Sequence, residues 1–390
     1  MTEDISPAWS ARTPPTPDEV ASILLSWIGL ELSSFRPLQT LWAGYGEIVS
    51  ISGQSGSATA TPLIMKLINP PPGNDEGHVR KMLSYEVEQE FYATVAPSLD
   101  VPLARCLSST RDRAGRPHAD RLDGILAMTM TDLRTHFPIP GEKRGHLPRP
   151  AVHAALDWLA RLHASTRGAK SAKDMDSYLL PPLEEAARRQ HGAGGSKLWL
   201  NGGYTYLATR RDELATLASS SGEWSALCSR DTQFGQSVAE AVAAVLVPRG
   251  RAEESVIHGD VKSENMFIAH DGSVAFCDFQ YAGLGLGVCD LAKLFTCSVP
   301  VEMLWKEDGA HSLAMQPGEK ELLERYRATL GEYGWDEMVR HWETALVDWC
   351  RFQASWGFWG NTEWLEARVR HILADVGWRA WMVDELGRVK

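Results

Sequence analysis

The sequence predicts an α+β protein built from two lobes. Its 390 residues exceed the length of a typical single domain. Short strand-like segments and one long helix fill the chain up to about residue 132, and helical periodicity dominates after it. We therefore expect a disordered lead-in over residues 1–15, a first lobe over 16–132 and a second lobe over 133–390.

Composition and charge exclude several classes of protein. A hydrophobic content of 44% and a charged content of 23% are those of a soluble globular protein. The net charge of −11 argues against a nucleic-acid partner, whose phosphates require a basic surface. The six cysteines show no zinc-site spacing, which favours free thiols in a reducing cytoplasm. No signal peptide and no membrane-spanning run is visible, so we expect a cytoplasmic protein, monomeric or homodimeric.

A glycine-containing turn lies between two strand candidates early in the chain. It reads Gly44-Tyr45-Gly46, after a strand at 35–42 and before a strand at 48–51. Glycines at such a turn let backbone N–H groups approach a phosphate closely. An ordinary hairpin turn without a phosphate is an equally good interpretation of the same residues.

One lysine stands inside the next apolar strand, and a helix rich in glutamate follows. The strand covers residues 63–68 and contains Lys66. If this lysine is buried, its positive charge requires an anionic partner. The alternative is an edge lysine that reaches out to water. The helix is predicted over 76–95, where Glu88 shares a face with the apolar residues that follow it.

Three polar side chains gather in the segment 256–280. The pattern is strand, polar loop, strand, short turn and strand, and it places Asp260, Asn265 and Asp278 at loop and strand ends. Phosphoryl transfer from a nucleotide needs such a set: one carboxylate takes the acceptor's proton, while an amide oxygen and a second carboxylate hold magnesium. Hard oxygen ligands suit Mg²⁺, and no soft ligand set competes here.

These motifs resemble those of a known superfamily. His258-Gly-Asp260 with Asn265, followed by Asp278-Phe-Gln280, is similar to the catalytic and metal loops of the protein-kinase-like superfamily. The resemblance is to its small-molecule branch: aminoglycoside phosphotransferases, choline kinases and the ecdysteroid-kinase-like group, of which Asp-Phe-Gln is most typical. It implies a bilobal fold with a small antiparallel-sheet N-lobe and a large, mainly helical C-lobe. It covers about 250 residues, with the catalytic loop at 256–268 and the metal loop at 276–282.

The resemblance assigns roles in the N-lobe. Lys66 is expected to contact the α and β phosphates of ATP and to be held by Glu88, which fits the pattern E-x-x-[FV]-Y. The nucleotide is expected beneath Gly44, Tyr45 and Gly46.

The hinge is the second N-lobe feature that the resemblance implies. Residues 124–133 are similar to the last N-lobe strand, so backbone groups near Met130, Thr131 and Leu133 are expected to pair with adenine. Thr131 replaces the glutamate usual in the family, which weakens the expectation of adenine over guanine.

In the C-lobe the resemblance makes Asp260 the base and Asn265 and Asp278 the Mg²⁺ ligands. His258 is expected to organise the loop, although a histidine there can also act as a base. Lys262 is expected to steady the transferring phosphoryl group, with a solvent-facing lysine as the alternative.

The C-terminal region is dense in tryptophan. Trp342, Trp349 and Trp356 recur every seven residues and so share one helix face. They can form the core of the lobe or an aromatic box for a quaternary ammonium group, and helical spacing favours the core.

The expected function is ATP- and Mg²⁺-dependent transfer of the γ-phosphoryl group to a hydroxyl of a small-molecule acceptor. Only eleven residues separate Asp278 from Asp290, too few for the activation segment of a protein kinase. A non-catalytic nucleotide-binding pseudokinase and a nucleotidyl transferase remain as alternatives.

Overall fold

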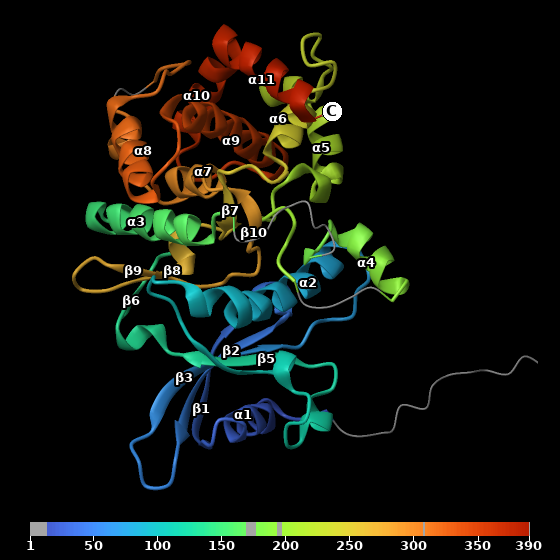
Figure 1. Ribbon diagram of the computed structural model, residues 1–390, viewed down its shortest axis with the longest axis vertical. Coiled ribbons are helices and arrows are strands. Elements are labelled where there is room, and N and C mark those ends of the chain that lie inside the picture. The colour runs from blue at the N-terminus through green and yellow to red at the C-terminus, as the bar shows by residue number, and fades with distance from the viewer. Residues whose placement is uncertain (1–13, 169–176, 193–196, 307–308, 390) are drawn as a thin grey trace, which may run out of the picture. The chain divides into compact units, whose positions relative to one another are not determined.

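The computed structural model describes residues 14–168, 177–192, 197–306 and 309–389 (Figure 1). The expected lead-in at 1–15 lies almost wholly outside the described residues. The chain divides into two compact units, residues 1–72 with 106–132 and residues 73–105 with 133–390. No disulfide bond forms among the described cysteines. No helix among the described residues is long and apolar enough to cross a membrane.

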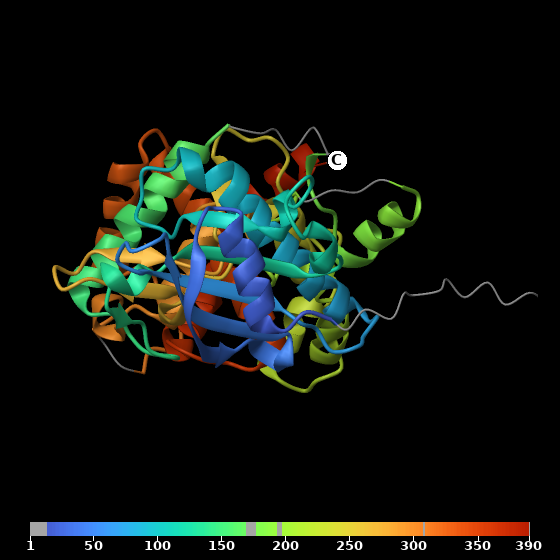
Figure 2. The same cartoon turned by 90° about the horizontal axis from the view of Figure 1, so that it is seen from below.

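A five-stranded antiparallel sheet with one helix forms the first unit. The strand order is β1-β2-β3-β5-β4, and every neighbouring pair is antiparallel. Helix α1 lies against one face of this sheet and contacts β1, β4 and β5 (Figures 1 and 2). The elements are α1 (Pro17–Ser26), β1 (Glu31–Thr40), β2 (Gly46–Gln54), β3 (Thr61–Ile68), β4 (Cys106–Ser109) and β5 (Leu126–Thr131).

The core of the first unit fills the space between α1 and the sheet. Helix α1 begins at a capping box in which Thr16 and Glu19 satisfy each other's backbone N–H groups. Strand β1 starts at Glu31, earlier than the predicted residue 35, because it is an edge strand whose mostly exposed residues give little apolar signal. The buried residues that meet in this core include Leu24, Leu25, Val49, Ile51, Leu63 and Met65.

The second unit is mainly helical and carries two small sheets. Strands β7 (Glu254–Ile257) and β10 (Gly283–Leu286) pair antiparallel, and β6 (Ile139–Pro140), β8 (Met266–Ile268) and β9 (Val274–Phe276) form a three-stranded sheet. Its helices are α2 (Glu76–Glu90), α3 (Arg149–Thr166), α4 (Pro182–Gln190), α5 (Arg211–Ala218), α6 (Val238–Leu246), α7 (Val288–Cys297), α8 (Pro317–Leu330), α9 (Trp335–Trp356), α10 (Thr362–Ala374) and α11 (Val376–Val389).

Helix α2 groups with the second unit, whereas its position in the sequence assigned it to the first lobe. The reason is its contacts: α2 packs on α4, and the Phe91 ring stacks on the Phe279 ring with centroids 3.9 Å apart. The α-helix ends at Glu90 and continues as a π-helical turn over Phe91–Val95, so the predicted helix to residue 95 has two parts.

Candidate functional site

The catalytic-loop candidate connects β7 to β8 and presents the buried side chain of Asp260. Its Oδ2 accepts hydrogen bonds from Lys262 Nζ at 2.9 Å and from Asn265 Nδ2 at 3.1 Å. Within the described residues, Oδ1 of Asp260 has no hydrogen-bond partner. One oxygen of this carboxylate is therefore anchored, and the other is available to accept a proton from a bound hydroxyl.

Lys262 carries a stable positive charge beside that carboxylate. Burial opposes the charge, but the neighbouring Asp260 outweighs it, so the pKa of Lys262 is raised above its ordinary value. The side chain keeps 32% of its surface exposed. Lys262 is therefore neither a deeply buried lysine nor the fully solvent-facing residue of the alternative interpretation.

The amide of Asn265 is oriented by two hydrogen bonds. Its Nδ2 donates to the backbone carbonyl of Asp260 at 2.8 Å as well as to the carboxylate. Because both contacts need a donor, the amide nitrogen faces Asp260 and the oxygen points elsewhere. Oδ1 has no hydrogen-bond partner among the residues that the structure describes, which suits a ligand for a cation.

Both ring nitrogens of His258 form hydrogen bonds with backbone groups. Nε2 lies 3.0 Å from the carbonyl oxygen of Cys277, and Nδ1 accepts from the backbone N–H of Asp260 at 3.2 Å. A carbonyl can only accept and an N–H can only donate, so the ring is neutral with its proton on Nε2. The side chain is fully buried. This geometry favours the organising role of His258 over that of a base.

Asp290 at the start of α7 fixes the backbone of the same loop. Its two oxygens accept from the N–H groups of His258 at 2.7 Å and Gly259 at 2.9 Å. His163 Nε2 lies 3.2 Å from the same carboxylate, and its Nδ1 lies 2.9 Å from the Tyr326 hydroxyl. Burial raises the pKa of Asp290, but the contacts with His163 outweigh it and the pKa is lowered. His163 is thus a buried structural histidine.

The metal-loop candidate follows β9. The N–H of Cys277 donates to the carbonyl of Asn265 at 3.0 Å. This hydrogen bond holds Asp278, the residue after Cys277, close to the catalytic loop. Asp278 has a left-handed backbone with φ of 66°, a conformation that aspartate tolerates better than most residues. Gln280 Nε2 donates to Asp278 Oδ1 at 2.5 Å, and the Ser84 hydroxyl lies 3.0 Å from Gln280 Oε1.

No group of three or more His, Cys, Asp or Glu side chains among the described residues could hold a metal ion by itself. Asn265 and Asp278 instead offer one amide oxygen and one carboxylate. Such a pair fits Mg²⁺, which usually takes one or two protein ligands and completes its shell with phosphate oxygens and water.

The predicted phosphate turn and lysine lie in the first unit. Residues Ala43 and Gly44 have positive φ values of 55° and 74°. At Gly46 a Cβ atom would lie 2.0 Å from the Leu67 carbonyl oxygen, so the close approach of β2 to β3 already requires that glycine. Tyr45 is buried. Lys66 is buried in β3, between Ile48 of β2 and Met128 of β5.

The other predicted nucleotide contacts are divided between the units. Met130 and Thr131 end β5 in the first unit, and Leu133 belongs to the second unit. Glu88 is buried on α2 in the second unit, whereas Lys66 belongs to the first. The pairing of Lys66 with Glu88, and of both with Asp260, Asn265 and Asp278, stays a prediction.

Comparison with known proteins shows which family the segment with these loops belongs to. The profile of the ecdysteroid kinase-like family matches residues 48–310, about two thirds of the chain, which includes the catalytic-loop and metal-loop candidates but not the turn at Gly44 to Gly46. The chain belongs to the ecdysteroid kinase-like family. This family lies in the small-molecule kinase branch of the protein-kinase-like superfamily. The predicted resemblance to that branch and the predicted bilobal α+β fold class are therefore confirmed.

Solved structures provide more distant similarities. Macrolide 2'-phosphotransferase of Brachybacterium faecium is 14% identical, with 95% of this chain and 98% of that chain covered and a TM-score of 0.44. An aminoglycoside phosphotransferase of Alicyclobacillus acidocaldarius is 15% identical, with 97% of each chain covered and a TM-score of 0.40. Choline kinase of Streptococcus pneumoniae is 12% identical, with 92% and 94% covered and a TM-score of 0.37. A search of curated proteins returned no match.

In this ecdysteroid kinase-like protein the tryptophan-rich region is mostly core. Trp342 and Trp349 are buried on α9, whereas Trp356 at the end of that helix is 53% exposed. The guanidinium of Arg210 lies over the Trp356 ring, 5.2 Å from its centroid, and over Phe352 at 5.4 Å. The protein's own cation therefore covers the most exposed of these rings.

Sequence reasoning missed two parts of the site. It treated Gln280 as a family marker and did not foresee its contacts with Asp278 and Ser84. It also gave no role to Gly259, where a Cβ atom would lie 2.4 Å from the Tyr281 carbonyl oxygen. The motif itself carried the signal for Gly259, because a glycine between two functional residues is suited to a close backbone approach.

Proposed function

We propose that this protein is an ATP- and Mg²⁺-dependent phosphotransferase that moves the γ-phosphoryl group to a hydroxyl of a small-molecule acceptor. The observation that carries the proposal is the Asp260 carboxylate, with Oδ2 held by Lys262 and Asn265 and with Oδ1 unengaged among the described residues. A base held in this way has one fixed orientation and one open acceptor atom.

In the proposed reaction the acceptor hydroxyl attacks the γ-phosphorus as the bond to the β-phosphate oxygen breaks, and ADP leaves. Oδ1 of Asp260 receives the hydroxyl proton. Lys262 lies 2.9 Å from Asp260 and supplies positive charge where the equatorial oxygens of the phosphoryl group gain negative charge. His258 and Asp290 keep the loop backbone in place.

Asn265 Oδ1 and Asp278 are the proposed ligands of Mg²⁺, which neutralises the phosphate charges when it is bound. Gln280 restrains Asp278 through a hydrogen bond of 2.5 Å. Lys66 and Glu88 are proposed to position the triphosphate, with Gly44, Tyr45 and Gly46 along the phosphates and the backbone from Met130 to Leu133 along the base.

A small-molecule acceptor is favoured by the segment after Asp278. Strand β10 occupies Gly283–Leu286 and α7 begins at Val288, so secondary structure fills the interval up to Asp290. An activation segment that could bind a protein substrate has no residues available there.

The test is transfer of labelled γ-phosphate from ATP into a metabolite extract. Wild-type protein is expected to label a discrete product, and Asp260→Asn and Asp278→Ala are expected to reduce the rate by at least a factor of about 10². Asp271→Asn is the matched control, because Asp271 lies in the exposed turn between β8 and β9 and, among the described residues, its side chain bonds only Ser273. Equal labelling by wild type and Asp260→Asn would overturn the proposal. ATP binding without any transfer would identify a pseudokinase.

A further inference from the structure

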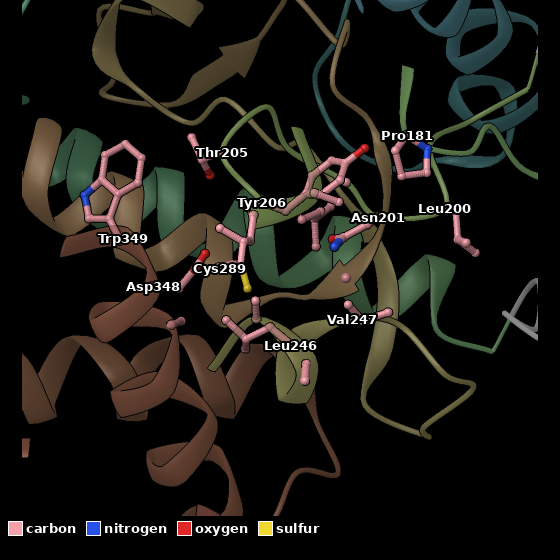
Figure 3. Close-up of a pocket in the computed structure, with 18 of the residues that line it drawn as sticks. Pro181, Leu200, Asn201, Thr205, Tyr206, Leu246, Val247, Cys289, Asp348 and Trp349 are labelled. Carbon is pink, nitrogen blue, oxygen red and sulfur yellow. The ribbon is translucent and has the colours of Figure 1, made fainter. Parts of the chain in front are cut away.

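A cavity lies within the helical unit, apart from the proposed catalytic residues. Its volume is about 310 Å³, which is in the range of small-molecule sites. It is enclosed by the loop 200–208 and by residues of α6, α7, α9 and β10, and its labelled lining includes Tyr206, Cys289 and Trp349 (Figure 3). None of Asp260, Lys262, Asn265 and Asp278 lines it.

Most of the wall is apolar. Aliphatic side chains come from the loop, from α6 and the residue after it, and from β7 and α9, so a hydrocarbon body is in contact on several sides. The main apolar members are Leu200, Leu207, Leu246, Val247, Ile257 and Ala345.

Among the described lining residues two are cations, the exposed Arg211 at the start of α5 and the buried Lys293. Lys293 on α7 is 5% exposed, and its Nζ lies 5.6 Å from the centroid of the Trp349 ring. Within the described residues, Lys293 has no hydrogen bond and no ion pair. A buried ammonium group is costly without a partner, and contact with an indole ring compensates only part of that cost.

The acidic groups around the cavity are already engaged. Asp348 Oδ1 accepts from Arg351 at 3.1 Å and 2.8 Å. Asp290 on the same helix as Lys293 accepts from His258 and Gly259. Glu240 is exposed and accepts from Ser237 at the start of α6.

The thiol and the phenol of the wall are neutral. Burial raises the pKa of the Cys289 thiol to about 12, so the thiol stays protonated near neutral pH and does not act as a nucleophile. Burial also raises the pKa of Tyr206. Lys293 therefore supplies the buried positive charge of the wall, and Arg211 adds an exposed one.

We propose that this cavity binds a small organic carboxylate, with the anionic group on Lys293 and an apolar body against the aliphatic wall. The inference concerns binding alone and does not rest on the proposed phosphotransfer. The site adjoins the catalytic-loop candidate: a Cβ atom placed on Gly203 would lie 3.5 Å from both Lys293 Nζ and the Gly259 carbonyl oxygen.

The experiment measures binding of octanoate to the full-length protein by calorimetry. Octan-1-ol has the same chain without the charge, and octylamine has the opposite charge. Octanoate is expected to bind at least tenfold more tightly than either. Lys293→Met is expected to weaken octanoate binding at least tenfold. Lys320→Met, a matched change at an exposed lysine that lies over the Trp335 ring, is expected to leave it unchanged.

A second variant keeps the test independent of the charge change. Ala244→Phe adds a ring to the wall from α6 and retains Lys293. It is expected to weaken octanoate and octan-1-ol binding alike. Octanoate affinity unchanged by both Lys293→Met and Ala244→Phe, in variants whose thermal unfolding is intact, would overturn the proposal. So would equal affinity of the wild type for octanoate and octan-1-ol.

Discussion

Gln280 Nε2 lies 2.5 Å from Oδ1 of Asp278, and this hydrogen bond ties the metal-loop carboxylate to the body of the helical unit. The other end of the same amide meets the Ser84 hydroxyl of α2 at 3.0 Å. Phe279 lies between Asp278 and Gln280 in the sequence, and its ring stacks on Phe91, the residue that follows α2. The position of Asp278 therefore depends on packing against α2 as well as on its own backbone.

Gln280→Leu tests this dependence. The leucine fills similar space but offers no donor, so Asp278 loses a restraint on its orientation. Residues that orient metal ligands typically contribute 10-fold to 100-fold in metal affinity or activity. We expect the Mg²⁺ concentration for half-maximal activity to rise about tenfold, as measured by titrating Mg²⁺ at saturating ATP.

Two further variants define the result. Ser84→Ala removes only the outer contact and is expected to have a smaller effect of the same sign. Gln233→Leu makes the same chemical change at an exposed site bonded to Arg379 and is expected to change nothing. An unaltered Mg²⁺ requirement in Gln280→Leu would show that Asp278 holds its orientation without the amide.

Lys262→Met tests the charge beside Asp260. The ammonium lies 2.9 Å from Asp260 Oδ2, so its loss removes positive charge from the proposed reaction centre without touching the nucleotide contacts. Removal of one such group typically lowers kcat by a factor of about 10² or more. We expect kcat to fall to that extent while KM for ATP changes little, in steady-state assays beside the exposed control Lys143→Met.

The pH dependence of the activity tests the role of Lys262 independently. The pKa of Lys262 is raised above 10.5, so its charge is retained below that value and is lost only at still higher pH. The activity of the wild type should therefore show no alkaline decline that is absent from Lys262→Arg between pH 7 and 10. A decline in that range, abolished by the arginine, would contradict the raised pKa.

The sequence located most of the individual parts of the candidate site. The alternation of strand, loop and strand around 256–280 is a local pattern, so β7, β8 and β9 and the residues between them were readable from the chain. The capping box at Thr16 and the apolar strand around Lys66 are local in the same sense.

The parts that sequence reasoning could not supply are contacts between distant segments. Ser84 and Gln280 are 196 residues apart, and nothing in either segment specifies the other. The same holds for the guanidinium of Arg210 over the Trp356 ring. His258 had two open roles because its Nε2 acquires a partner only when Cys277 folds beside it.

Gly259→Ala tests the close approach of the catalytic loop to its surroundings. Gly259 has a φ of 85°, and an added Cβ would lie 2.4 Å from the Tyr281 carbonyl oxygen and 2.7 Å from the Gly203 nitrogen. The left-handed backbone costs about 1–2 kcal/mol for alanine, and overpacking adds about 1–3 kcal/mol. We expect the free energy of unfolding in urea to fall by about 2–5 kcal/mol, with activity lost.

Gly124→Ala separates the two costs. Gly124 has a similar φ of 76°, but an added Cβ meets no atom within 4 Å. Only the backbone cost should appear there, so the free energy of unfolding is expected to fall by about 1–2 kcal/mol. Equal losses in the two variants would show that the loop relaxes around the extra methyl group at Gly259.

His341→Gln tests how a buried histidine limits stability in acid. Burial, with Arg251 and Arg249 nearby, lowers the pKa of His341 to about 3 from an ordinary 6.5. Between these values the unfolded chain binds a proton that the native protein does not, so stability falls as the pH is lowered from 6.5 toward 3. The slope contributed by this one group approaches about 1.4 kcal/mol per pH unit.

Glutamine keeps an acceptor for the Tyr333 hydroxyl, which lies 2.5 Å from His341 Nδ1, but does not titrate. The variant should therefore lose less stability than the wild type between pH 6.5 and 5, a difference of about 2 kcal/mol in urea unfolding. His270→Gln, at an exposed turn residue, should follow the wild type across the same range. If His341→Gln also parallels the wild type, the native protein must accept a proton at His341 near pH 6, which requires the helix α9 around it to open.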